Sequence, residues 1–174
     1  CVELEAIDIW QKVSLIGTSA FSNCIKLSAV NVEENYAERI YEPKVFEKCK
    51  SLCNKQGMLI VDGIFWEYHG GGGDVVIPEG VTVIGKNVFR EGVSGSFRNV
   101  EKFREKGSLK SVVFPSTLRK ISKNAFTSCE ALKTVKLPDG LQSIDTEVFQ
   151  GCDQLTKIEI GTGLNKIGSD VFLG

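Results

Sequence analysis

A pattern of about 23 residues recurs along the chain and limits the possible folds more than any other feature. The two clearest copies run over Cys129–Phe149 and Cys152–Phe172, and both fit C-x-x-L-x-x-V/I-x-I/L-P/G-x-x-L-x-x-I-x-x-x-V/A-F. A phenylalanine recurs in phase at Phe21, Phe46, Phe89, Phe126, Phe149 and Phe172. The last three are 23 residues apart, and the earlier gaps are 25, 43 and 37 residues. We therefore expect about six repeats, two with insertions, in a single solenoid domain over residues 1–174.

Each repeat carries the signals of two short strands and a tight turn. Val135 and Leu137 alternate with polar residues, which predicts a half-buried strand. Pro138 ends this strand because proline has no N–H to donate to a strand ladder. Leu141 and Ile144 predict a second, shorter extended segment. A small cap-type residue and an apolar pair ending in Phe follow, which predicts one turn of α or 3₁₀ helix.

One repeat cannot bury its own apolar side, but stacked repeats bury it against each other, so the sequence predicts a solenoid with internal ladders. The in-phase repeats, above all I-P-x-x-V-x-x-I-G-x-x-x-F at Ile77–Phe89, resemble the BspA-like leucine-rich repeat family of bacteria and protists. The resemblance implies a curved, right-handed leucine-rich repeat solenoid of the α/β type, rich in β structure. It also implies a parallel β-sheet on the concave face, with short helical turns and second short strands elsewhere. The second repeat departs from the pattern over residues 35–41, where we expect an irregular surface.

The first insertion covers residues 53–74. Two runs of strand-forming residues flank Asp62-Gly63, which is a strong signal for a two-residue hairpin turn. We therefore expect a β-hairpin, after which Gly70–Gly73 return the chain to the solenoid register. Trp66 and Tyr68 share one predicted hairpin face. Buried, they would pack on the solenoid; exposed, they would contact a sugar or a protein partner.

The second insertion covers residues 90–107. Phe97, Val100 and Phe103 recur at steps of three after a glycine-containing loop, which predicts a short amphipathic helix. Two interpretations stay open. The helix packs its phenylalanines on the solenoid edge, or it is a recognition element that uses residues such as Phe97 and Arg98.

The stretch HGGGGDVV, from His69 to Val76, has the composition of an oxyanion loop or a phosphate-binding loop. An oxyanion loop of this kind needs a G-x-S-x-G nucleophile elbow, which the sequence lacks, and a catalytic histidine nearer the C-terminus, whereas His69 is the only histidine. A Walker-type loop needs Gly-Lys-Ser/Thr, but Asp74 follows the last glycine. The sequence therefore favours a connector without catalytic or cofactor-binding residues.

Four cysteines share one position, three residues after the ladder phenylalanine: Cys24, Cys49, Cys129 and Cys152. A residue fixed by the repeat phase is usually internal, and a small thiol fits a tight bend where it can bond backbone groups weakly. A disulfide between neighbouring positions would need suitable Cβ geometry. Cys49, Cys53 and His69 are too few for a closed zinc site, so no metal is expected.

Because the ladders use the apolar residues, function is expected on outward strand positions. Strand alternation predicts two exposed lanes with no nucleophile–base pair on them. The middle lane is Asp8, Asn31, Val76, Val113, Lys136 and Glu159, and the second lane is Ala6, Ala29, Asp74, Ser111, Thr134 and Lys157. As a whole, such a surface is either a solvated sheet face or the partner-binding side of a solenoid.

The composition is that of an ordinary globular protein, with a net charge of −1 from 21 basic and 22 acidic residues. It gives no reason to expect a nucleic acid partner, and no apolar run approaches the roughly 20 residues of a membrane span. The family resemblance implies a cell-surface or extracellular adhesion module that binds host matrix protein, cell-surface protein or glycan, with no enzymatic role. The alternative is a spacer that presents another domain of a larger surface protein. We also expect further repeats, at least on the N-terminal side, because neither end carries a dedicated polar cap.

Overall fold

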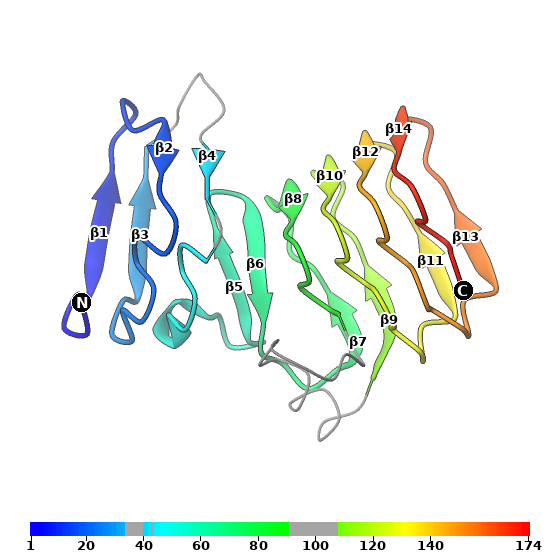
Figure 1. Ribbon diagram of the computed structural model, residues 1–174, viewed down its shortest axis with the longest axis horizontal. Coiled ribbons are helices and arrows are strands. Elements are labelled where there is room, and N and C mark those ends of the chain that lie inside the picture. The colour runs from blue at the N-terminus through cyan, green and yellow to red at the C-terminus, as the bar shows by residue number, and fades with distance from the viewer. Residues whose placement is uncertain (34–39, 43, 91–107) are drawn as a thin grey trace. The chain divides into compact units, whose positions relative to one another are not determined.

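The computed structural model describes residues 1–33, 40–42, 44–90 and 108–174, and it divides into two compact units of short strands joined by turns (Figure 1). Unit 1, Cys1–Asp62, contains β1 (Ala6–Ile9), β2 (Leu15–Ile16), β3 (Ala29–Val32), β4 (Ile40–Tyr41), η1 (Lys50–Leu52) and β5 (Met58–Val61). Unit 2, Gly63–Gly174, contains β6 (Ile64–Tyr68), β7 (Gly73–Val76), β8 (Val83–Ile84), β9 (Leu109–Val113), β10 (Lys120–Ile121), β11 (Thr134–Lys136), β12 (Ser143–Ile144), β13 (Lys157–Glu159) and β14 (Lys166–Ile167).

The strands within each unit pair in parallel with the corresponding strand one turn away. In unit 1, β1 pairs with β3 and β2 pairs with β4. In unit 2, the longer strands pair as β7 with β9 and β11 with β13, while the ladder of shorter strands runs β6–β8–β10–β12–β14. Parallel neighbours need a crossover, and the rest of each repeat supplies it. The protein is thus a β-solenoid of about six turns with parallel sheets, as the sequence predicts. Its curvature and handedness stay predictions.

The phenylalanine ladder is confirmed within each unit. Ring centroids lie 5.7 Å apart for Phe21–Phe46, 5.0 Å for Phe89–Phe126, 5.2 Å for Phe126–Phe149 and 5.9 Å for Phe149–Phe172, all stacked. Aliphatic residues in and beside the strands are buried as well, among them Leu118, Ile121, Leu132, Leu137, Leu141 and Ile144. The core is therefore a set of one-residue ladders, and each turn contributes one side chain to each ladder.

The predicted helical turn before each phenylalanine is wrong for the described repeats. These segments are tight turns, and the one helical element among the described residues, η1, follows Phe46. The backbone gives the reason, because the residue two positions before each ladder phenylalanine has a left-handed φ between 55° and 63°, which cannot continue a right-handed helix. These residues are Ser19, Lys44, Asn87, Asn124, Glu147 and Asp170. The turn bonds to the next repeat instead: the Phe126 N–H donates to the Val148 carbonyl at 3.0 Å.

Strands β5 and β6 lie where the sequence predicts the two hairpin strands. Asp62 and Gly63 between them have φ values of 53° and 68°, the sign required by a type I′ turn. The second of these strands belongs to the solenoid, because β6 pairs in parallel with β8 and places Phe65 opposite Ile84. Residues 53–74 are therefore only partly an insertion, since they supply a strand of the solenoid itself.

The segment predicted as an amphipathic helix falls on residues 91–107, which lie outside the described residues. Phe97 and Arg98 belong to it, and their role as partner-binding residues stays a prediction. The stretch predicted to be irregular in the second repeat runs over residues 35–41, and its residues 35–39 also lie outside the described residues.

Candidate interaction surface

The in-phase cysteines are internal, as the repeat position predicts. Cys24, Cys49, Cys129 and Cys152 are buried, and all six cysteines of the chain are free thiols. Three of them donate to the carbonyl oxygen of a ladder phenylalanine one turn earlier: Cys49 to Phe21 at 2.9 Å, Cys129 to Phe89 at 3.2 Å and Cys152 to Phe126 at 3.1 Å. The thiol therefore fills the bend and bonds one turn of the solenoid to the next.

His69 and the glycines after it connect two strands. The His69 Nε2 atom lies 2.9 Å from Glu67 Oε2, and its Nδ1 atom is buried without a hydrogen-bond partner among the described residues. Gly72 and Gly73 both have a positive φ, near 70°, as they lead the chain into β7. Within the described part of the chain, no three His, Cys, Asp or Glu side chains are grouped closely enough to hold a metal ion.

On unit 1, the predicted lane places two polar side chains in register. Asp8 lies opposite Asn31 between β1 and β3, and the Asn31 Nδ2 donates to Asp8 Oδ1 at 2.7 Å. Both side chains are exposed, and Trp10, just beyond β1, is 61% exposed. These residues form a small polar and aromatic surface on the first unit.

On unit 2, the two lanes lie in register across neighbouring long strands. Val76 lies opposite Val113, Thr134 opposite Lys157 and Lys136 opposite Glu159. Val76 is 65% exposed and Val113 is 56% exposed. We call the exposed side of β7, β9, β11 and β13 the strand face, and its outward residues are Asp74, Val76, Lys110, Ser111, Val113, Lys133, Thr134, Lys136, Lys157 and Glu159.

One hydrogen bond and one ion pair fix two polar pairs of the strand face. Ser111 Oγ donates to Asp74 Oδ1 at 2.6 Å, and Lys157 Nζ lies 2.6 Å from Glu159 Oε1. The hydrogen bond from Lys157, followed by its charge, holds the pKa of Glu159 below the ordinary value, and the same contact raises the pKa of Lys157. Both groups are therefore charged across the physiological pH range.

Two residues of the strand face, Lys110 and Lys133, are absent from the predicted lanes. Both are exposed and each directly follows a buried leucine, Leu109 or Leu132. The sequence does contain a signal for them, because L-K-S/T-V occurs at the same phase in both repeats. Strand alternation alone misses this position for two reasons. Lys110 lies at a register irregularity between β7 and β9, where Gly73 is opposite Leu109 but Asp74 is opposite Ser111. Lys133 lies just before β11 begins.

The aromatic residues of β6 lie mainly in the core. Tyr68 is only 6% exposed, and its ring centroid lies 5.0 Å from that of Phe89. The glycine at position 70 makes this possible, because a Cβ there would collide with the tyrosine ring. Burial raises the pKa of Tyr68, which the Gly72 N–H partly offsets by donating to the hydroxyl. Tyr68 is therefore a core residue, unavailable to a partner, whereas Trp66 is half-buried.

Strand alternation placed Tyr68 on the same face as Trp66, but its ring instead joins Phe65 in the core. The reason is that Tyr68 is the last residue of β6, where the chain turns and the alternation ends.

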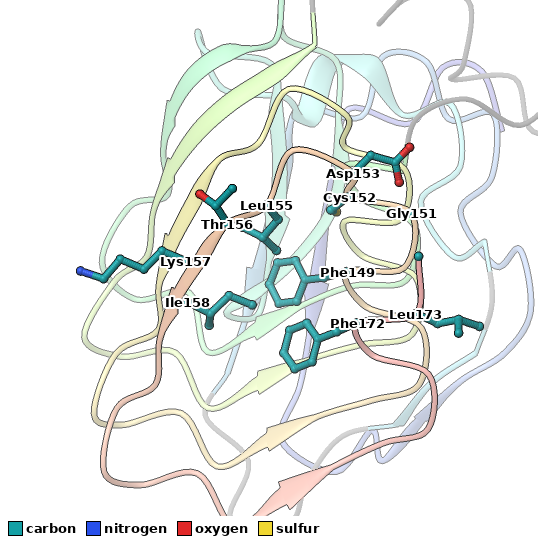
Figure 2. Close-up of a pocket in the computed structure, with 11 residues that line it drawn as sticks. Phe149, Gly151, Cys152, Asp153, Leu155, Thr156, Lys157, Ile158, Phe172 and Leu173 are labelled. Carbon is teal, nitrogen blue, oxygen red and sulfur yellow. The ribbon is translucent and has the colours of Figure 1, made fainter.

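A hollow of about 560 Å³ lies beside the last turn of unit 2 (Figure 2). Phe149, Phe172 and Ile158 point into it, while Lys157 points away from it. Its apolar lining residues occupy the same repeat positions as the core ladders, so the hollow is the exposed end of those ladders. Phe172 is accordingly 47% exposed. The one thiol of the lining, Cys152, donates to the Phe126 carbonyl at 3.1 Å.

Acid–hydroxyl pairs link the repeats at the position after the long strands. Glu79 accepts hydrogen bonds from the Ser116 N–H at 2.9 Å and from the Ser116 hydroxyl at 3.0 Å. Asp139 accepts from the Thr162 N–H at 3.1 Å. The Ser116 N–H holds the pKa of Glu79 below its ordinary value. These pairs hold the ends of the long strands in register and thereby support the strand face.

The stacked turns, the parallel strand columns and the in-phase ladders define a β-solenoid repeat protein. A model of the BspA type leucine-rich repeat region matches six copies in the chain, over residues 1–57 and 98–174. These residues are more than half of the chain, which therefore belongs to the BspA-type leucine-rich repeat family, as its sequence resemblance indicates. No curated protein matches the chain.

Three solved structures are similar to the chain at low identity. A leucine-rich repeat protein from Bacteroides ovatus is 22% identical, with a TM-score of 0.41, over 98% of this chain and 58% of that one. A leucine-rich cell surface protein from Faecalibacterium prausnitzii is 20% identical, with a TM-score of 0.40, over 97% and 60%. The leucine-rich repeat protein of T. pallidum is 20% identical, with a TM-score of 0.32, over 94% and 72%. The chain therefore spans about three fifths of the first two proteins.

Within the described residues, no helix is long and apolar enough to cross a membrane.

Proposed function

We propose that the protein is a non-enzymatic binding module of a cell-surface protein and that it attaches to a protein partner through the strand face. The observation that carries this proposal is the in-register exposure of Val76 and Val113 beside the polar residues Lys136 and Glu159. Exposed aliphatic pairs surrounded by polar groups are typical of surfaces that bind other proteins. The backbone ladders fix these side chains, so less freedom is lost when a partner binds.

The surroundings of His69 support a module without a catalytic role. Neither ring nitrogen of this histidine contacts a hydroxyl or thiol of a described residue. The cell-surface location and the adhesive role are supported by the family resemblance, which implies attachment to host matrix protein, cell-surface protein or glycan. The Asp8–Asn31 surface with Trp10 is a second candidate contact on unit 1.

The test is binding of the purified chain to immobilised matrix proteins, cell-surface proteins and glycans. The strand-face variant Val76→Asp/Val113→Asp is compared with a matched control, Leu15→Asp/Ile167→Asp, which alters exposed aliphatic residues of the short strands. Thermal melts check that both variants fold. Saturable binding that is lost only in the strand-face variant supports the proposal. Binding that both variants retain contradicts the strand face as the site, and no binding at all favours the spacer.

A further inference from the structure

The strand face carries more positive than negative charge. Its outward residues include four lysines, at positions 110, 133, 136 and 157, against the two carboxylates Asp74 and Glu159. The whole chain has a net charge of −1. The excess of positive charge on the strand face is therefore a local feature of the chain.

Both carboxylates of the strand face are already engaged by neighbours on the same face. Glu159 is paired with Lys157 at 2.6 Å, and Asp74 accepts a hydrogen bond from Ser111 at 2.6 Å. Lys110 and Lys133, by contrast, form no ion pair with another described residue. An incoming carboxylate can therefore reach these two ammonium groups without first displacing an internal partner.

The lysines lie beside the exposed valine pair. Lys110 and Val113 belong to the same strand, β9. Lys133 directly precedes the neighbouring strand β11, and Lys136 is the last residue of β11. Strands β9 and β11 are in contact, although they belong to different two-stranded sheets. When a partner places a side chain on Val76 and Val113, the neighbouring residues of that partner therefore come within reach of the lysines.

Resting on the proposed function, we propose that the partner of the strand face is an acidic protein segment. It places an apolar side chain on the Val76–Val113 pair and carboxylates against Lys110, Lys133 and Lys136. The apolar pair favours a protein over a sulfated polysaccharide, which has no aliphatic side chain to bury there. Charge complementarity of this kind mainly raises the association rate and sets partner choice, and salt weakens it.

The experiment measures binding of the full chain to three synthetic peptides, alternating Glu-Leu, Gln-Leu and Lys-Leu, and to heparin. We expect the Glu-Leu peptide to bind best, and more weakly as the salt concentration rises. Lys110→Glu/Lys133→Glu should weaken it by about tenfold, because each reversal replaces an attraction by a repulsion. The control Lys86→Glu/Lys166→Glu makes the same charge change at exposed positions elsewhere in unit 2 and should leave binding unchanged.

Equal loss in the control variant, or equal binding of the Lys-Leu peptide, overturns the inference because the lysines of the strand face would then have no specific role. Tighter binding of heparin than of the Glu-Leu peptide overturns it in favour of a polyanion site. If the Gln-Leu peptide binds as well as Glu-Leu and the valine variant abolishes both, the acidic partner is wrong while the proposed function stands. The proposed function itself fails separately, when the valine variant changes no binding to any natural protein.

Discussion

At the scale of single residues, left-handed backbone positions enclose the ladder phenylalanines. One lies two residues before each phenylalanine, and a second lies two residues after Phe21, Phe46, Phe126 and Phe149, as at Ser128 and Gly151. Residues other than glycine adopt this conformation at a cost of about 1–2 kcal/mol, which the surrounding hydrogen bonds offset. Gly151 avoids the cost, and its N–H donates to the Leu173 carbonyl at 2.9 Å.

Replacing Gly151 by alanine should lower the free energy of unfolding by about 1 kcal/mol, because φ is 67° and a Cβ would be strained there. Urea denaturation followed by circular dichroism measures the change. The matched control is Gly17→Ala, since the nearest atom to its added Cβ is a Glu42 side-chain oxygen at 3.9 Å and its φ is not positive. A larger loss at Gly17 than at Gly151 would contradict the backbone argument.

Replacing a ladder phenylalanine should lower the free energy of unfolding more in the interior of the stack than at its end. Phe126 is fully buried and stacks on both Phe89 and Phe149, so Phe126→Ala should cost about 3–5 kcal/mol. Phe172 is 47% exposed with one stacked neighbour, and its alanine variant should cost far less. Equilibrium unfolding of both variants compares the two positions. Equal losses would show that stacking on two sides adds nothing.

At the scale of the structural elements, acid–hydroxyl pairs hold one repeat against the next, and they predict a pH dependence. The folded-state pKa of Glu79 lies below its ordinary value of 4.5 because it accepts hydrogen bonds from Ser116. The unfolded chain therefore binds the proton more readily. The stability from this group is present above pH 4.5 and is lost as the pH falls through the lower folded-state pKa.

Glu79→Gln should thus flatten the fall in stability with decreasing pH, as measured by denaturation at a series of pH values between 6 and 3. The effect should be small, because the group is exposed. Ser116→Ala gives the control, because it removes the hydroxyl donor but keeps the Ser116 N–H: in that background, Glu79→Gln should retain most of its effect on the pH profile. Loss of that effect in the Ser116→Ala background would contradict the backbone N–H as the main cause.

Strand alternation and repeat phase predict those parts of the fold in which every turn repeats the same contact. The Phe ladder, the internal cysteines and the exposed lanes, such as Val76–Val113, are of this kind. Sequence reasoning fails where the backbone conformation determines the local structure. Lys44, for example, has a left-handed φ that its residue type does not predict. It also fails at Tyr68, where the strand and its alternation end, and at Lys110, where the register between β7 and β9 is irregular.

At the scale of the whole molecule, the hydrogen bonds and ladders between turns hold each unit together without a disulfide among the six cysteines. Because each turn contacts mainly the turns before and after it, stability is shared among many similar interfaces. The buried thiols are part of these interfaces. The thiol of Cys129, for example, donates to the carbonyl of Phe89, one turn earlier. Their protection from solvent therefore reports directly on the stacking of the turns.

Thiol labelling of the native protein should accordingly show one rapidly reacting cysteine, the exposed Cys1, and slower reaction at the half-buried Cys53. The four buried thiols should react only as the solenoid opens, since a thiol shielded from solvent cannot be attacked. Cys1→Ser should remove the fast phase and leave the other rates unchanged. A reducing agent should not shift the melting temperature. A reductant-dependent melt, or a fast phase of four or more thiols in the folded protein, would contradict a solenoid whose turns are stacked through buried free cysteines.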